Sequence, residues 1–277
     1  MSTIEKEETV QSARRGLLVF FLILVPLTAI SYILALTVTP VYGLLLMWAP
    51  GISSILTRIL LREGFADISL RFGGRRTLKT IPFILLLPVA VGLVAYGTAW
   101  ITGLAEYTGH NGNVVGSLAG AILIQMSIGT AMGIISSAGE ELGWRGYMLT
   151  RLIQARVPKP ILMSGLIWGM WHIPAILIGS YYSGPSLALS IVLFMVTISS
   201  FNIIISLLRL STGSIWPAVL LHASWNAIIQ DAFDRFTSGT NAYLWTGESG
   251  ILVAVTLVIA AWIFYRRSAL VKQTARL

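Results

Sequence analysis

Long apolar segments follow one another along this chain, and the polar stretches between them are too short to hold a soluble domain. Each segment is close to the roughly 20 residues that an α-helix needs to cross about 30 Å of hydrocarbon. Hydrophobic residues make up 56% of the chain, charged residues only 11%, and the mean hydropathy is +0.81. The sequence therefore predicts an all-α, polytopic integral membrane protein with about eight transmembrane helices. The predicted spans are residues 16–36, 42–61, 82–102, 116–139 with an extension to 150, 160–179, 187–208, 214–230 and 250–265.

Basic residues are distributed unevenly between the loops. If both termini lie in the cytoplasm, all of the 19 lysines and arginines except Arg235 fall on the cytoplasmic side. This is the positive-inside pattern, and it predicts an N-in, C-in helix bundle surrounded by the lipid bilayer of the cell membrane. The same pattern explains the net charge of +8 without a nucleic acid partner. The first span is too long for the apolar part of a signal peptide and is expected to be retained.

Four ionisable residues lie within or next to the predicted spans, where a charge costs about 2.5–3.5 kcal/mol even on the most lenient scale. They are Glu140, Glu141, His172 and His222. Counted at 1.5 Å per residue from the cytoplasmic side, Glu140 lies about 16 Å deep, His172 about 18 Å and His222 about 12 Å. Their similar depth on three helices predicts a single site. For Glu140 this requires the fourth helix to continue beyond it.

Three pairs of residues are spaced four apart, so that each pair shares a helix face: Glu141 with Arg145, Trp168 with His172, and His222 with Asn226. Arg145 can neutralise one or both carboxylates and keep them ionised at low dielectric. The chain has no cysteine, which excludes thiolate nucleophiles and cysteine-ligated metals.

Two chemistries fit these side chains. Glu140, His172 and His222 could bind zinc through two histidines and a glutamate, or they could activate a water molecule without a metal. Asn226 and an N–H group of His222 could stabilise an oxyanion.

Each feature also has a purely structural interpretation. A single histidine in a membrane helix is commonly a hydrogen-bonded packing residue. Trp144 and Arg145 could form an interfacial pair, with the arginine reaching toward lipid headgroups. The polar residues Gln125, Ser199, Ser200 and Asn202 are interpreted first as hydrogen bonding between helices. Two carboxylates and two imidazoles at one depth still favour a functional site, because packing alone does not offset the cost of burying them.

Three motifs, in this order, resemble those of the CPBP family, the CAAX prenyl protease and bacteriocin-processing group that is also called Abi. Residues 139–147, Gly-Glu-Glu-Leu-Gly-Trp-Arg-Gly-Tyr, resemble its EExxxR motif. Residues 168–172 resemble the FxxxH motif, with Trp168 in place of the phenylalanine, and residues 222–226 match HxxxN. The resemblance covers about residues 115–230.

This resemblance implies an eight-helix intramembrane endopeptidase, similar to the type II CAAX prenyl endopeptidase, whose site opens toward the cytoplasm. By analogy, Glu140 is the general base that activates water with the help of His172, while His222 and Asn226 form the oxyanion hole. The implied supporting residues are Glu141, Arg145 and Trp168. Members of the family are described both as metalloproteases and as metal-free, glutamate-dependent proteases. Zinc on Glu140, His172 and His222 and a metal-free mechanism therefore both stay open.

The implied substrate is a membrane-associated protein or peptide, lipidated or not, that enters laterally between helices. A non-proteolytic bacteriocin-immunity or membrane scaffold protein of the same family is the alternative. A proton-coupled transporter is disfavoured, because the sequence has no recognisable inverted repeat. The expected division is residues 1–115 for the first three spans, 116–230 for the catalytic core, and 231–277 for the last span and basic tail. The remaining histidine, His110, and Glu248 are assigned to external loops.

Overall fold

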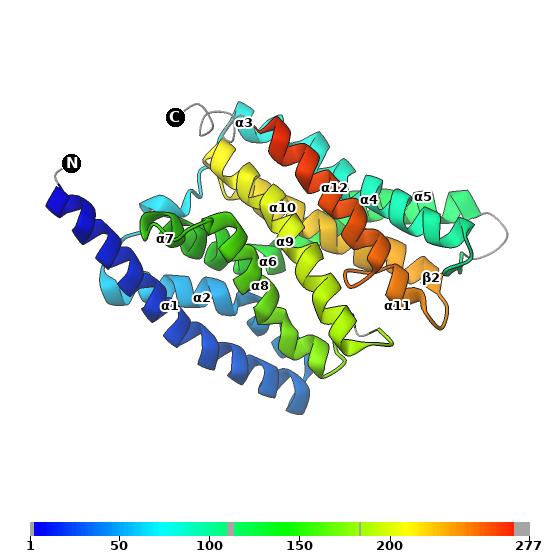
Figure 1. The fold of residues 1–277 in the computed structure, drawn as a ribbon, viewed down its shortest axis with the longest axis horizontal. Coiled ribbons are helices and arrows are strands. Elements are labelled where there is room, and N and C mark those ends of the chain that lie inside the picture. Colours follow the sequence, from blue (N-terminus) through cyan, green and yellow to red (C-terminus); the bar gives the residue numbers. More distant parts are fainter. Residues whose placement is uncertain (1–2, 110–113, 183, 269–277) are drawn as a thin grey trace.

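The computed structural model describes residues 3–109, 114–182 and 184–268, and most of them form long helices (Figure 1). Six of these are continuous α-helices: α1 (Thr3–Thr37), α2 (Gly43–Leu61), α4 (Ile81–Ile101), α8 (Pro160–Leu177), α9 (Leu187–Thr212) and α12 (Ile251–Arg267). A further helical run consists of α5 (Val114–Ile124), α6 (Thr130–Gly143) and α7 (Leu149–Gln154), joined by π-helical turns at Gln125–Gly129 and Trp144–Met148. α10 (Trp216–Trp225) passes directly into a π-helical segment, Asn226–Phe233.

Six of the described helical segments are long and apolar enough to cross a membrane. They coincide with the first six predicted spans and confirm an all-α, polytopic membrane protein. The seventh and eighth predicted spans correspond to α10 with its π-helical extension and to α12. The count of eight transmembrane helices and the N-in, C-in arrangement stay predictions.

The fourth helix continues beyond Glu140, as the depth argument requires. Glu140 and Glu141 lie in α6, and the chain remains helical through the π-helical turn Trp144–Met148 and α7. A π-helical turn replaces i→i+4 hydrogen bonds by i→i+5 bonds and is frequent at functional sites. The two carboxylates therefore lie inside the helix bundle and not at its surface.

Glycines allow α2 to pack closely against α6. A Cβ atom on Gly143 would lie 2.3 Å from the Cβ atom of Pro50, and one on Gly51 would lie 2.5 Å from the carbonyl oxygen of Gly139. Small residues favour such close backbone contact in membranes, where there is no hydrophobic force between helices. This contact holds the part of α6 that carries Glu140 against α2.

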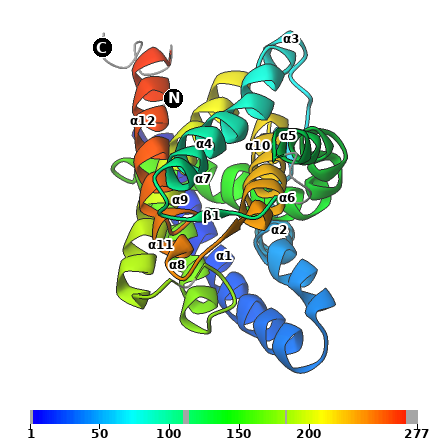
Figure 2. The same cartoon turned by 90° about the vertical axis from the view of Figure 1, so that its right-hand side faces the viewer.

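α9 forms the centre of the bundle and packs against α8, α10 and α12 (Figure 2). Its core side chains include Phe194, Phe201 and Ile205, which are at most 2% exposed. Asn202 also lies on this buried helix and contacts α8 and the π-helical turn that follows α6. The central helix thus contributes both apolar packing and one polar contact to the site region.

Ion pairs connect the loop after α2 to α7. Arg151 contacts Glu63 Oε2 through Nη2 at 2.7 Å and Asp67 Oδ2 through Nη1 at 2.6 Å. Arg58 also pairs with Asp67. Burial alone would raise the pKa of the Asp67 carboxyl, but hydrogen bonds and charges from Arg151 and Arg58 lower this pKa below its usual value. This network closes the end of the molecule that holds α3 (Arg75–Leu78).

The opposite end is formed by short elements. β1 (Glu106–Tyr107) pairs antiparallel with β2 (Thr237–Ser238), so that Glu106 is opposite Ser238. α11 (Ala242–Trp245) follows β2 and leads into α12. Figure 1 shows β2 and α11 at the end opposite α3 and the two termini.

Candidate active site

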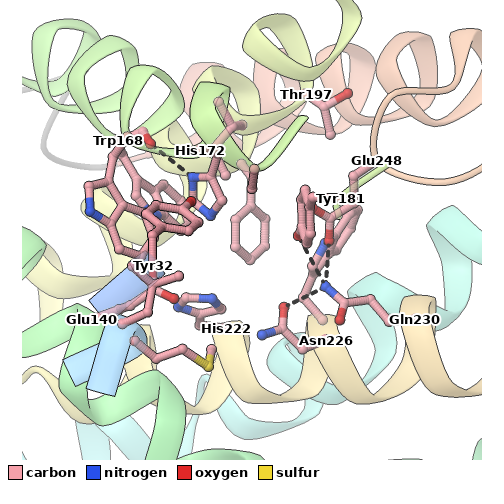
Figure 3. A pocket seen from close by; sticks show the side chains of 17 residues that line it. Tyr32, Glu140, Trp168, His172, Tyr181, Thr197, His222, Asn226, Gln230 and Glu248 are labelled. Atoms are coloured by element: carbon pink, nitrogen blue, oxygen red, sulfur yellow. Dashed lines mark hydrogen bonds between the residues drawn. The ribbon is translucent and has the colours of Figure 1, made fainter. Parts of the chain in front are cut away.

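A cavity of about 250 Å³ lies between α1, α2, α6, α8, α9 and α10 (Figure 3). Glu140, His172, His222 and Asn226 all line it. The structure thus brings together the four side chains that the sequence analysis selected as catalytic, from three separate helical runs. His110 lies outside the described residues. The chemical roles of the four residues stay predictions.

Glu140 is held by two tryptophans. Its side chain is buried, and Oε2 accepts hydrogen bonds from Trp168 Nε1 at 2.9 Å and from Trp144 Nε1 at 3.2 Å. Among the described residues no donor is recorded for Oε1, which leaves this oxygen available to a water molecule. Trp144 and Arg145 are each only 1% exposed, so their interpretation as an interfacial pair was wrong.

The orientation of His172 determines which of its nitrogens is available in the neutral ring. Nδ1 lies 2.9 Å from the carbonyl oxygen of Trp168. Because a carbonyl oxygen can only accept, Nδ1 must carry the hydrogen. The Nε2 atom of a neutral ring then has a free lone pair, as a proton acceptor requires.

His222 is oriented by the second carboxylate. Its Nδ1 donates to Glu141 Oε1 at 2.9 Å, and the same oxygen accepts from Arg145 Nη1 at 2.8 Å. Arg145 Nη2 donates to Asn202 Oδ1 at 2.9 Å, and the guanidinium lies 3.9 Å from the ring centre of Trp168. The predicted pairing of Glu141 with Arg145 and the interhelical hydrogen bonding of Asn202 are both confirmed.

The sequence analysis missed a polar group on the far wall of the cavity. Gln230 Nε2 contacts Asn226 Oδ1 at 3.4 Å and Glu248 Oε1 at 3.1 Å. Glu248 also accepts from Trp225 Nε1 at 2.8 Å and from the Tyr181 hydroxyl at 2.6 Å. Figure 3 shows these side chains across the cavity from Glu140, with the Nδ2 atom of Asn226 on the His222 side.

One of the missed residues had a signal in the sequence. Gln230 follows Asn226 by four residues and therefore continues the stripe of His222 and Asn226 along one helix face. Glu248 had none. It lies in the loop before α12, but its side chain points inward and is only 3% exposed.

The side chains were tested for their fit to zinc. No group of three or more histidine, cysteine, aspartate or glutamate side chains in the described part of the chain is arranged to hold a metal ion. Oε2 of Glu140 accepts from two indole N–H groups, and Nδ1 of each histidine is bound to another protein group, so a metal ion would have to use Oε1 of Glu140 and the two Nε2 atoms. The structure does not gather the predicted ligand set Glu140, His172 and His222 around one metal position.

Residues 119–228 match a family model described as type II CAAX prenyl endopeptidase Rce1-like. The matched segment contains Glu140, His172, His222 and Asn226, whereas Gln230 and Glu248 lie beyond it.

One curated relative is the CAAX prenyl protease 2 of Methanococcus maripaludis, which is 31% identical over 138 residues. The aligned region covers 48% of this chain and 47% of that protein. The chain therefore matches about half the length of this relative.

Proposed function

We propose that this protein is an intramembrane endopeptidase that hydrolyses a peptide bond of a membrane-associated protein or peptide. The proposal rests mainly on one observation: Glu140 and His172 line the same buried cavity as His222 and Asn226. The Rce1-like match over this region supports the same class of reaction.

The proposed reaction begins with a water molecule beside Glu140. The carboxylate, assisted by Nε2 of His172, takes a proton as the water oxygen attacks the carbonyl carbon of the substrate. The carbonyl oxygen becomes an oxyanion, which accepts hydrogen bonds from Nδ2 of Asn226 and from Nε2–H of protonated His222. When the C–N bond breaks, the proton held by Glu140 passes to the leaving amine, and the products are a carboxylic acid and an amine.

Three residues position this machinery without contacting the substrate. Glu141 fixes the orientation of the His222 ring, and Arg145 in turn neutralises Glu141. Trp168 binds Glu140 through its indole N–H and His172 through its carbonyl oxygen. Such fixed contacts keep catalytic groups in place, on which their contribution to the rate depends.

An apolar groove supports lateral entry of the substrate. It lies between α1 and α8, and it shares Tyr32 and Trp171 with the catalytic cavity. Its other lining residues are almost all apolar and include Leu24 and Met170. We assign this groove to the apolar segment of the substrate, which is either a peptide stretch or a covalently attached lipid. The protein would lie in the cell membrane, with its basic end in the cytoplasm.

Comparison of membrane proteomes tests the proposed function. Cells with the wild type should contain peptide termini that are absent from cells with Glu140→Gln at equal abundance. The matched control is Glu106→Gln, because Glu106 is exposed on β1, away from the cavity. Identical termini in all three strains would contradict the proposal and favour the immunity or scaffold alternative.

Metal dependence is tested separately. We propose the metal-free mechanism, because in the described part of the chain Glu140, His172 and His222 are not arranged around one metal position. Purified protein should contain no stoichiometric zinc and should keep its proteolytic activity in a chelator. Loss of activity in the chelator, with recovery on adding zinc, would establish the metalloprotease alternative.

A further inference from the structure

Basic residues mark one end of the bundle. Most described lysines and arginines lie on segments at the end of the molecule where α1 begins and α12 ends, together with α3 and α7, whose positions Figure 1 shows. Among the described residues the exceptions are Arg145, which is buried beside the site, and Arg235, which lies just before β2 at the opposite end. Because positively charged loops remain in the cytoplasm, the end that holds β2 and α11 faces outward.

The catalytic cavity extends toward this outer end. Away from Glu140 it is bounded by residues near helix termini on the outer side. They are Tyr32 late in α1, Leu46 and Met47 early in α2, Ala175 in the last turn of α8, and Tyr181 and Glu248 in the adjoining loops. The active-site groups thus form the inner end of the cavity, and its remaining lining residues lie between them and the outer face.

A dense layer closes the site on the basic side. Glu141, Trp144, Arg145, Tyr147 and Met148 follow Glu140 toward the cytoplasm and are each at most 1% exposed. The contacts of Arg145 with Glu141 and with Asn202 of α9 tie this layer across the bundle. Water and a polar chain therefore do not reach Glu140 from the basic side, and the apolar groove between α1 and α8 admits only the apolar segment of a substrate.

A second cavity lies next to the catalytic one, at the outer end of the bundle. It has a volume of about 390 Å³ and is lined by residues of the outer loops and helix ends, among them Ser180, Asp234 and Tyr243. Tyr181 and Gln230 line both this cavity and the catalytic one. They are joined by a hydrogen bond of 3.2 Å, and both bind Glu248. Tyr181 and Gln230 therefore form a wall that the two cavities share.

We propose that the catalytic cavity opens to the extracytoplasmic side, through the wall formed by Tyr181, Gln230 and Glu248. The substrate class is then a peptide segment presented at the outer face of the membrane. This departs from the cytoplasmic opening that the sequence resemblance implied. The direction of opening rests on the lining of the cavity together with the distribution of basic residues, whereas the assignment of a peptide substrate rests on the proposed endopeptidase function.

The absence of cysteine makes the opening directly measurable. Single cysteines are introduced at two cavity positions, Thr197→Cys and Ala175→Cys, of which Thr197 lies on α9 within the bundle. Two exposed positions serve as controls for the two membrane faces. They are Thr240→Cys at the outer end and Ser211→Cys at the basic end. Each variant is treated with a membrane-impermeant maleimide in right-side-out and in inside-out vesicles.

The proposal predicts that both cavity cysteines react in right-side-out vesicles, together with Thr240→Cys. Ser211→Cys should react in inside-out vesicles alone. Reaction of the cavity cysteines from the Ser211 face, or from neither face while they react in detergent, would overturn the proposal. Inverted labelling of Thr240→Cys and Ser211→Cys would overturn the outward orientation.

The same labelling in a Glu140→Gln background separates this inference from the proposed function. The pattern should not change, because accessibility does not require turnover. A protein with outward labelling and no proteolysis would keep the direction of opening and refute the endopeptidase proposal.

Discussion

At the scale of single residues, Trp168 contacts more residues of the site than any of the four residues predicted to be catalytic. Its indole N–H binds Glu140, its carbonyl oxygen accepts from His172, and its ring lies against the Arg145 guanidinium. The sequence indicated its link to His172, because the two are four residues apart. It could not indicate the contact with Glu140, which depends on how α8 packs against α6.

The oxyanion donor gives a kinetic prediction. Asn226→Ala should lower kcat by roughly 10²–10³-fold with little change in KM, because the lost hydrogen bond forms mainly in the transition state. Gln230→Ala should lower kcat less, because Gln230 only orients the Asn226 amide through its Oδ1 atom. The double variant Asn226→Ala/Gln230→Ala should have the same kcat as Asn226→Ala alone.

Steady-state cleavage of a peptide containing the processed bond checks this prediction. Gln125→Ala is the matched control, since Gln125 lies in the π-helical turn before α6 and does not line the cavity. Fully additive losses from Asn226→Ala and Gln230→Ala would show that Gln230 does not act through Asn226.

The buried ion pair gives a prediction about stability. Arg145→Met leaves Glu141 buried without its arginine and should lower the free energy of unfolding by about 3–5 kcal/mol. Thermal unfolding in detergent measures the loss. Arg15→Met serves as the control, because Arg15 is exposed and should change stability by less than about 0.5 kcal/mol. Equal unfolding temperatures for both variants would contradict the assigned contact.

At the scale of elements, π-helical turns occur next to the site on two helical runs. One follows Glu141 at Trp144–Met148, and the other begins at Asn226. Apolar periodicity predicts a helix at both places but carries no signal for i→i+5 hydrogen bonding. The sequence could therefore place the candidate catalytic residues on helices, but it could not predict their relative orientation.

The close contact between α2 and α6 can be tested at Gly143. A Cβ atom there would collide with Pro50, so Gly143→Ala should push α2 away from α6. We expect a loss of about 1–3 kcal/mol in the free energy of unfolding, together with reduced proteolysis. Gly97→Ala on α4 is the control, because a Cβ at Gly97 meets no atom within 4 Å. An unchanged Gly143→Ala protein would show that α2 is free to shift.

Asp234, at the outer end of the π-helical segment, predicts a pH dependence. Burial raises the pKa of its carboxyl to about 7, although Tyr182 and Tyr96 donate hydrogen bonds to it. This pKa exceeds the unfolded value of about 3.9, so the protonated carboxyl of Asp234 contributes to the stability of the folded protein. The contribution is complete below about pH 3.9 and is lost as the pH rises through about 7.

Thermal unfolding across this pH range tests the prediction. Between about pH 5 and about pH 8 the unfolding temperature of the wild type should fall relative to that of Asp234→Asn. Parallel curves for the two proteins would show that Asp234 does not titrate in this range.

At the scale of the whole molecule, hydropathy predicted the first six spans because lipid-facing helices need apolar side chains along most of their length. The seventh predicted span is not among these six for a physical reason: α10 and its π-helical extension carry His222, Asn226 and Gln230, which line the cavity. The same inward polar residues that made the site recognisable also lower the apolar character of this span.

The loops were the least predictable part of the molecule. The sequence assigned Glu248 to an external loop but carried no information that its side chain points into the cavity. The arginine network around Asp67 likewise depends on tertiary contacts between residues far apart in the sequence. Charge counting predicted which loops share a membrane face, and the three-dimensional packing determined which of their side chains reach the interior.

The central claim is that Glu140 performs hydrolysis inside this bundle. The most direct test adds purified protein to membranes from cells that lack it and identifies new peptide termini by mass spectrometry. Wild type and Glu106→Gln should generate the same new termini, and Glu140→Gln, folded to the same unfolding temperature, should generate none. New termini from Glu140→Gln at the wild-type rate would contradict the account.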